Sequence, residues 1–237
     1  MTATTAMLGL GAVATVVTAR RGEPLAISGT LGYFAVMEAL QLWGYGVRDA
    51  CGTPSNEAVT LLSYIHISLQ PIVINAFAMA IAPRRIPART QRRVVLVAAL
   101  ATALIAARLL PFESLGTCVP GTSMCSERLC LTSGEWHIAW ELPLNGILAP
   151  TGRFLGGWLQ FPEYFLAVFL LPLCYGAWRF VLFHLAVGPL VAYNLTSNPN
   201  EMPAIWCLFS IGILLIGLSP AIRHRVFAAH RSDPAPG

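Results

Sequence analysis

Long apolar stretches separated by short polar segments dominate the chain. A membrane-spanning helix needs about 20 mainly apolar residues, and seven stretches approach or exceed that length. They cover residues 2–19, 25–46, 57–82, 94–111, 154–172, 174–195 and 204–222. The pattern predicts an all-α fold, a polytopic membrane helix bundle with seven transmembrane helices.

Composition agrees with a membrane protein and excludes several other classes. Of the 237 residues, 56% are hydrophobic and only 11% are charged, whereas soluble domains contain about 25% charged residues. Intrinsic disorder requires more charge and less hydrophobicity than this. The basic residues are all arginine, so no lysine amine is present to form a Schiff base. The net charge of +4 is placed according to membrane topology, and we expect no nucleic-acid partner.

The distribution of arginine predicts the orientation in the membrane. Five arginines lie between Arg84 and Arg93, and six others fall on the same side, against four on the opposite side. Since arginine concentrates in cytoplasmic loops, we expect the N-terminus outside and the C-terminus inside. Residues 1–231 then form a single transmembrane domain with an outer loop at about 112–153, followed by a short disordered tail at 232–237.

Four cysteines share the predicted outer side. Cys51 lies in the loop between the second and third spans, and Cys118, Cys125 and Cys130 lie in the long outer loop. An oxidising compartment permits disulfides there, and the sequence leaves three pairings open. A zinc site is the alternative, although the spacing is not that of a zinc knuckle. We expect a bacterial inner membrane or another cell membrane with an oxidising outer side.

Four ionisable side chains reach a similar predicted depth within four different spans. Glu38, His66, Glu163 and His184 lie about 12–16 Å from the outer ends of their helices, at a rise of 1.5 Å per residue. Charged groups at this depth are costly unless they are paired or face a cavity, so we expect one shared polar site. The neighbouring polar residues that would support it are Gln41, Ser63, Gln70 and Gln160.

Two glutamates and two histidines form a ligand set that suits a divalent metal, zinc or iron. In this interpretation Glu38, His66, Glu163 and His184 hold the metal, and the two glutamates are also candidate catalytic groups. The alternative cofactor is haem b, with His66 and His184 as axial ligands. A third interpretation is structural, in which each polar side chain hydrogen-bonds a neighbouring helix.

The outer segment 134–143 alternates aromatic and ionisable residues. We expect it to act as a lid, with His137 as a third candidate catalytic residue or with Glu141 in contact with substrate. A bridge from Cys51 to the long loop would hold such a lid over the mouth of the bundle. The alternative is an aromatic belt, in which tryptophans anchor the loop at the lipid headgroups.

Residues 64–79, residues 134–144 and the seven-span pattern resemble an uncharacterised family of seven-span integral membrane proteins from bacteria and large DNA viruses. The resemblance implies a fold without an activity. In outline the chain is also similar to the ceramidase and adiponectin-receptor group of membrane zinc hydrolases. The His-x-x-x-His pair found on the last span of that group is missing from this sequence.

Three functions follow from these patterns. The first is a membrane-embedded metal-dependent enzyme, in which the metal activates water to attack a lipid or other amphiphile that enters from the outer leaflet. The second is a transporter or proton-coupled carrier, with Glu38 and Glu163 as titrating sites. The third is a non-catalytic membrane subunit. In each case the lipid bilayer is the expected partner.

Overall fold

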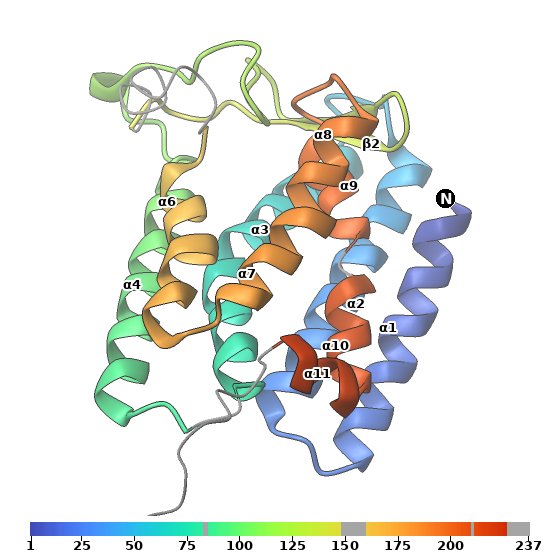
Figure 1. Ribbon diagram of the computed structural model, residues 1–237. Coiled ribbons are helices and arrows are strands. Elements are labelled where there is room, and N and C mark those ends of the chain that lie inside the picture. Colours follow the sequence, from blue (N-terminus) through green and yellow to red (C-terminus); the bar gives the residue numbers. More distant parts are fainter. Residues whose placement is uncertain (83–84, 148–159, 210, 227–237) are drawn as a thin grey trace, which may run out of the picture.

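The computed structural model describes residues 1–82, 85–147, 160–209 and 211–226, and its helices stand side by side in one bundle (Figure 1). The longest helices are α1 (Thr2–Arg20), α2 (Leu25–Val47), α3 (Pro54–Ala80) and α4 (Ala88–Ala107). The shorter ones are α6 (Pro162–Phe165), α7 (Trp178–Leu185), α8 (Val191–Leu195), α9 (Met202–Leu208), α10 (Ile211–Leu218) and α11 (Pro220–Val226). The connecting turns η1 (Glu113–Leu115) and η3 (Leu171–Tyr175) are 3-10 helices, and η2 (Leu166–Leu170) and η4 (Ala186–Leu190) are π-helical.

Five helices are long and apolar enough to cross a membrane. They are α1, α2, α3, α4 and the continuous helix Trp178–Leu195, which combines α7, η4 and α8. Each lies where a span was predicted, with ends shifted by only a few residues. These five helices identify an integral membrane protein.

The other two predicted spans are shorter or interrupted in the structure. The helix Pro162–Tyr175 replaces the predicted span 154–172, whose first residues lie outside the described part of the chain. The predicted span 204–222 is divided, because α9 ends at Phe209, where the backbone leaves the helical conformation. Pro220 then begins the separate helix α11, since proline lacks the N–H that would continue α10. The structure therefore does not confirm seven spans.

Small side chains explain how α1 packs against α2. The buried face of α1 repeats at helical spacing and consists of Thr4, Met7, Gly11, Ala14 and Thr18. A Cβ at Gly11 would lie 2.9 Å from the Cβ of Ala35 on α2. The backbones of α1 and α2 therefore approach closely through glycine and alanine, as is common between helices in membranes.

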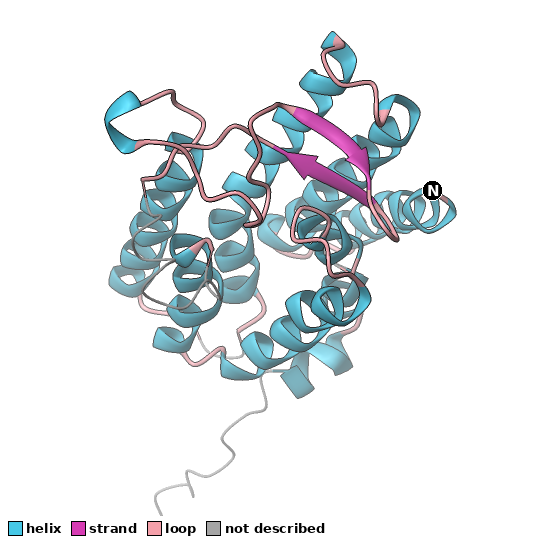
Figure 2. Cartoon of the chain, turned by 90° about the horizontal axis from the view of Figure 1, so that it is seen from above, coloured by secondary structure: helices cyan, strands magenta, loops and turns pink. Residues whose placement is uncertain are grey.

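A cap of residues 112–147 covers one end of the bundle and contains the one departure from an all-α fold in the described chain. Strand β1 (Cys130–Ser133) pairs with β2 (Ile138–Glu141) in an antiparallel hairpin, which lies across the helix ends (Figure 2). Two disulfides form, Cys51–Cys130 and Cys118–Cys125. The predicted disulfides are thus confirmed, and the first joins the cap to the loop between α2 and α3.

The arginine-rich loop lies at the opposite end of the bundle from the cap (Figure 1). Of its arginines, Arg85, Arg89, Arg92 and Arg93 are described and exposed. The predicted tail 232–237 and the arginines at 84, 153 and 231 lie outside the described residues. The chain thus separates its disulfides and its arginine cluster at opposite ends, as an asymmetric membrane protein requires.

Candidate functional site

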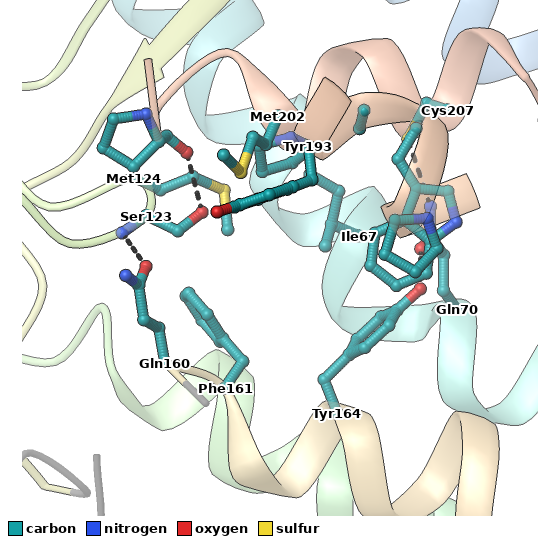
Figure 3. Close-up of a pocket in the computed structure, with 15 residues that line it drawn as sticks. Ile67, Gln70, Ser123, Met124, Gln160, Phe161, Tyr164, Tyr193, Met202 and Cys207 are labelled. Carbon is teal, nitrogen blue, oxygen red and sulfur yellow. Dashed lines mark hydrogen bonds between the residues drawn. The ribbon is translucent and has the colours of Figure 1, made fainter. Parts of the chain in front are cut away.

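A cavity of about 480 Å³ lies between the cap and the bundle. Its walls come from α3, from the cap, from the start of α6 and from the segment that includes η4, α8 and α9 (Figure 3). Four aromatic side chains form much of the lining, namely Phe161, Tyr164, Tyr193 and Trp206. Met124 and Met202 add flexible apolar surface, and no charged side chain is among the described residues that line the cavity.

One end of the cavity carries a short chain of hydrogen bonds. The hydroxyl of Tyr164 donates to Gln70 Oε1 at 2.5 Å, and Gln70 Nε2 donates to the thiol sulfur of Cys207 at 3.5 Å (Figure 3). Gln70 and Tyr164 are almost fully buried, so neither polar group is satisfied by bulk solvent. A second polar edge lies in the cap, where the backbone N–H of Ser123 donates to Gln160 Oε1. Gln70 and Gln160, both predicted as supporting residues, line this cavity.

Glu163 is neutralised by an arginine. Its Oε1 lies 3.6 Å from Arg108 Nη1, and both side chains are almost entirely buried. The Arg108 guanidinium also stacks at 4.0 Å over the ring of Phe161 and donates to the Gln160 carbonyl at 3.2 Å. Arg108, one of the four arginines predicted on the outer side, supplies the compensation that a buried carboxylate needs. This pairing removes the reason for placing a metal beside Glu163.

His184 lies among aromatic rings. The indole Nε1 of Trp206 donates to His184 Nε2 at 3.2 Å, and the rings of Phe169 and Phe180 lie within 6 Å of the imidazole. Because an indole N–H can only donate, Nε2 must be unprotonated, and the ring proton then lies on Nδ1. Binding a metal through Nε2 would displace the indole, and binding through Nδ1 would set two N–H groups against each other. In this arrangement His184 does not fit a metal or a haem iron.

The other two predicted ligands belong to α2 and α3. Glu38 is 1% exposed, and neither of its carboxyl oxygens has a hydrogen-bond partner in the described structure. The imidazole of His66 stacks on Tyr33 with ring centroids 3.7 Å apart, and its Nε2 is buried without a partner. Two predicted supporting residues behave in the same way, since Gln41 Oε1 and Ser63 Oγ are also buried and unpartnered.

The described residues offer no support for the shared metal centre expected from the sequence. Across residues 1–82, 85–147, 160–209 and 211–226, no three His, Cys, Asp or Glu side chains are grouped so that they could hold a metal ion. Glu163 pairs with Arg108 and His184 with Trp206, whereas the Glu38 carboxyl and His66 Nε2 have no partner among the described residues.

His137 lies in the cap, away from the cavity. Its Nε2 lies 3.3 Å from the hydroxyl of Thr4 on α1, and its ring packs 5.3 Å from that of Tyr45. Burial lowers the pKa of His137 to about 4, so the imidazole is neutral near pH 7. His137 is not among the described residues that line the cavity. Glu141 binds Arg128 at 2.7 Å near the protein surface.

Glu201 is the main polar anchor of the cap, and the sequence analysis did not identify it. It is completely buried and accepts hydrogen bonds from the backbone N–H groups of Glu135 at 2.9 Å and Trp136 at 2.6 Å. It also accepts from the N–H of His137 and from the hydroxyl of Thr196 at 2.6 Å. Its place immediately before Met202-Pro203 was a signal for a helix start only. The contact with residues 135–137, far away in sequence, left no local pattern.

Comparison with known proteins identifies a family. The model of a family of unknown function (DUF5765) matches residues 2–227. The chain belongs to this family. The DUF5765 match spans every residue of the cavity and of the cap, and no curated protein or solved structure matches the chain. The family supplies no activity, so the function must be argued from the cavity itself.

Proposed function

We propose that this membrane protein binds an uncharged amphiphile, a lipid-like molecule with one hydrogen-bonding end, in the cavity between cap and bundle. The observation that carries the proposal is the cavity's combination of size and lining. A volume of about 480 Å³ falls within the range of about 300–1,000 Å³ that is usual for ligand sites. Such sites are mostly apolar, with a few polar groups that fix orientation.

The lining determines which ligand chemistry fits. Aromatic rings from Phe161, Tyr164 and Trp206 offer flat apolar surface for a ring system or an acyl chain. Gln70 and Tyr164 offer hydrogen bonds at one end. A phosphate or carboxylate would lose its hydration there without meeting a cation, which is costly. A hydroxyl or carbonyl head group therefore suits this cavity better than an ionised one.

The cavity reaches the outer surface of the bundle. Tyr193 lines it and is 61% exposed, and Leu190 on the preceding turn is also exposed. In a bundle that stands in lipid, apolar side chains at this surface face the membrane. We place the cap on the oxidising outer side, with the N-terminus outside and the bundle crossing the membrane seven times. The ligand then enters from the outer leaflet.

The proposal is a binding function rather than metal-dependent hydrolysis. Glu163 forms an ion pair with Arg108, and the ring nitrogens of His184 are unsuited to a metal. The groups that remain at the cavity are amides, hydroxyls and one thiol. These groups orient a ligand through hydrogen bonds, and the described lining residues include no carboxylate or imidazole to transfer a proton to it.

Photolabelling tests the proposal directly. The purified protein is incubated with a photoreactive long-chain alcohol and, separately, with the fatty acid of the same length at a pH that ionises it. We expect the alcohol to label peptides that contain Tyr164 or Trp206 and the acid to label them much less. Equal labelling by both probes, or labelling spread over the exposed faces of the helices, would contradict the proposal.

Matched variants locate the ligand. Ala192 is buried and lines the cavity, so Ala192→Phe should fill it and abolish alcohol labelling. Ala103→Phe is the control, because Ala103 lies on the exposed face of α4. Tyr164→Phe removes the hydroxyl at the polar end and should weaken labelling about threefold to tenfold. Its control is Tyr175→Phe, whose hydroxyl donates to Asn75 at 2.9 Å outside the cavity lining.

A further inference from the structure

Two hydrogen bonds fix how α2 and α3 lie alongside each other. They join Asn56 Nδ2 to the Val47 carbonyl at 2.9 Å and Thr30 Oγ1 to the Val73 carbonyl at 3.5 Å. Since the helices run in opposite directions, counting inward from either bond places Glu38 level with residue 65. Glu38 is therefore within one helical turn, in depth, of Ser63 and His66.

Helix α9 closes the same junction. Gln41 Nε2 donates to the Ala204 carbonyl at 3.1 Å. One turn further into the bundle, α2 carries Glu38 and α9 carries Cys207. Cys207 in turn accepts the hydrogen bond from Gln70, which lies one turn from His66 on the same face of α3. The helices α2, α3 and α9 thus meet around one buried polar region.

This region holds a concentration of buried polar atoms without partners in the described chain. They are both carboxyl oxygens of Glu38, Gln41 Oε1, Ser63 Oγ and His66 Nε2. Leaving a buried neutral polar group unsatisfied is costly, and leaving an ionised carboxylate unsatisfied costs more. Each of these atoms can accept a hydrogen bond, the hydroxyl of Ser63 can also donate, and His66 Nε2 accepts when the ring proton lies on Nδ1. A proton on the carboxyl group would remove the charge and provide a second donor.

We infer that the junction of α2, α3 and α9 is an internal proton-binding site, in which Glu38 carries the proton and His66 Nε2 is the neighbouring acceptor, directly or through water. Binding takes one proton from the aqueous phase and breaks no other bond. The site goes beyond ligand binding and does not depend on it. Gln70 and Cys207 nevertheless line the cavity, so the site is separated from a bound ligand by one layer of side chains.

Few other ionisable groups face Glu38 from the elements packed around it. Helix α1 carries only Arg20, which is exposed at its far end, and α10 has no ionisable residue. From α3 and α9 the facing groups are His66 and Cys207, and α2 itself adds Tyr33 and Tyr45. The nearest strand, β2, contributes Glu141, which is engaged with Arg128. No arginine in the described chain is paired with Glu38, in contrast to Glu163.

Infrared difference spectroscopy of the purified full chain tests the inference. At neutral pH, Glu38→Gln should lose one band of a protonated carboxylic acid relative to the wild type. Glu57→Gln is the control, because Glu57 lies on α3 near its outer end and is only partly buried; it should leave the carboxylic-acid band unchanged. Loss of a carboxylate band in Glu38→Gln would overturn the inference.

Titration of the wild-type protein provides a test that needs no folded variant at position 38. The carboxylic-acid band should disappear in a single-proton transition as the pH is raised. His66→Gln should move the midpoint of that transition by about one pH unit, a tenfold change in proton affinity, with the photolabelling of the cavity retained. A midpoint that is unchanged by His66→Gln would contradict the role of the histidine, and absence of the band from the wild type at neutral pH would contradict the site.

Discussion

Two buried glutamates, Glu201 in the cap region and Glu38 in the bundle, occupy opposite electrostatic environments. Both are at most 1% exposed. The carboxylate of Glu201 accepts four hydrogen bonds, from three consecutive backbone N–H groups and a threonine hydroxyl. The carboxyl of Glu38 accepts none from the described residues. Glu201 therefore stabilises the folded protein, whereas burial of Glu38 is unfavourable and other interactions must compensate for it.

The difference between the two glutamates distinguishes the cap, which is a structural scaffold, from the interior of the bundle, which holds the candidate sites. The cap is fixed by disulfides, by Glu201 and by Asn56, whose side chain bonds both the N–H and the carbonyl of Leu131. These bonds fasten the cap to the ends of the helices. The interior below the cap keeps a cavity and unpartnered polar atoms, and groups of this kind concentrate at functional sites. A stable cap allows the less satisfied interior to persist.

The largest effect is expected from Glu201→Ala. The substitution leaves three N–H groups and the Thr196 hydroxyl without an acceptor, at about 1–3 kcal/mol for each group that stays buried. We expect a loss of about 5 kcal/mol in stability, measured by thermal unfolding in detergent. Glu201→Gln, which keeps one acceptor oxygen, should lose less. Equal stability of Glu201→Ala and wild type would remove Glu201 from the scaffold.

The two disulfides should differ in their contribution. Cys51–Cys130 closes 79 residues and Cys118–Cys125 closes 7. Loop entropy in the unfolded chain gives about 4 kcal/mol for the first and about 2 kcal/mol for the second. Serine substitution of each pair should therefore lower the thermal midpoint more for Cys51–Cys130. The reverse order would show that native interactions of the cap outweigh the entropy of the unfolded chain.

The sequence predicted the parts of this molecule that depend on local or compositional signals. Apolar length identified the five spans, and the cysteine positions identified the disulfide end. The hairpin was missed because Cys130–Ser133 and Ile138–Glu141 are short and flanked by polar residues. Nothing in the sequence near Pro220 or Phe209 was read as an interruption of the last predicted span.

The site was predicted less well, because its partners are distant in sequence. The predicted depth in the membrane placed Glu38 and Glu163 in one site, although Glu163 meets Arg108 at the end of α4 and Glu38 faces α3 and α9. Arg108, at the end of an apolar stretch that precedes Glu163 by about 50 residues, could have been proposed as its partner from charge compensation. The hydrogen bond from Trp206 to His184 could not have been proposed from the sequence, since it depends on the close approach of α9 to η4.

Gly188→Ala tests that approach, with a smaller expected effect. A Cβ at Gly188 would lie 2.3 Å from Trp206 Nε1, so the indole must move and release its hydrogen bond to His184. Overpacking of this kind costs about 1–3 kcal/mol, and the tryptophan fluorescence should change as well. Gly9→Ala on α1 is the control, because a Cβ there meets nothing within 4 Å. A similar response from both variants would contradict the close contact between η4 and α9.

Glu38→Gln should have the smallest effect and gives the sharpest contrast with Glu201. Replacing a neutral carboxyl group by an amide of nearly the same shape leaves the packing intact and introduces no charge. Because Glu38 accepts no hydrogen bond in the described chain, no donor loses its partner. We expect the free energy of unfolding to change by no more than about 0.5 kcal/mol, or to rise slightly.

If Glu38 were instead ionised and held by a bound cation, the same substitution would cost about 3–5 kcal/mol of stability, as when one partner of a buried charge pair is removed. Thermal unfolding of Glu38→Gln beside Glu201→Gln therefore distinguishes a carboxylate that accepts hydrogen bonds from its surroundings from a carboxyl group that carries a proton.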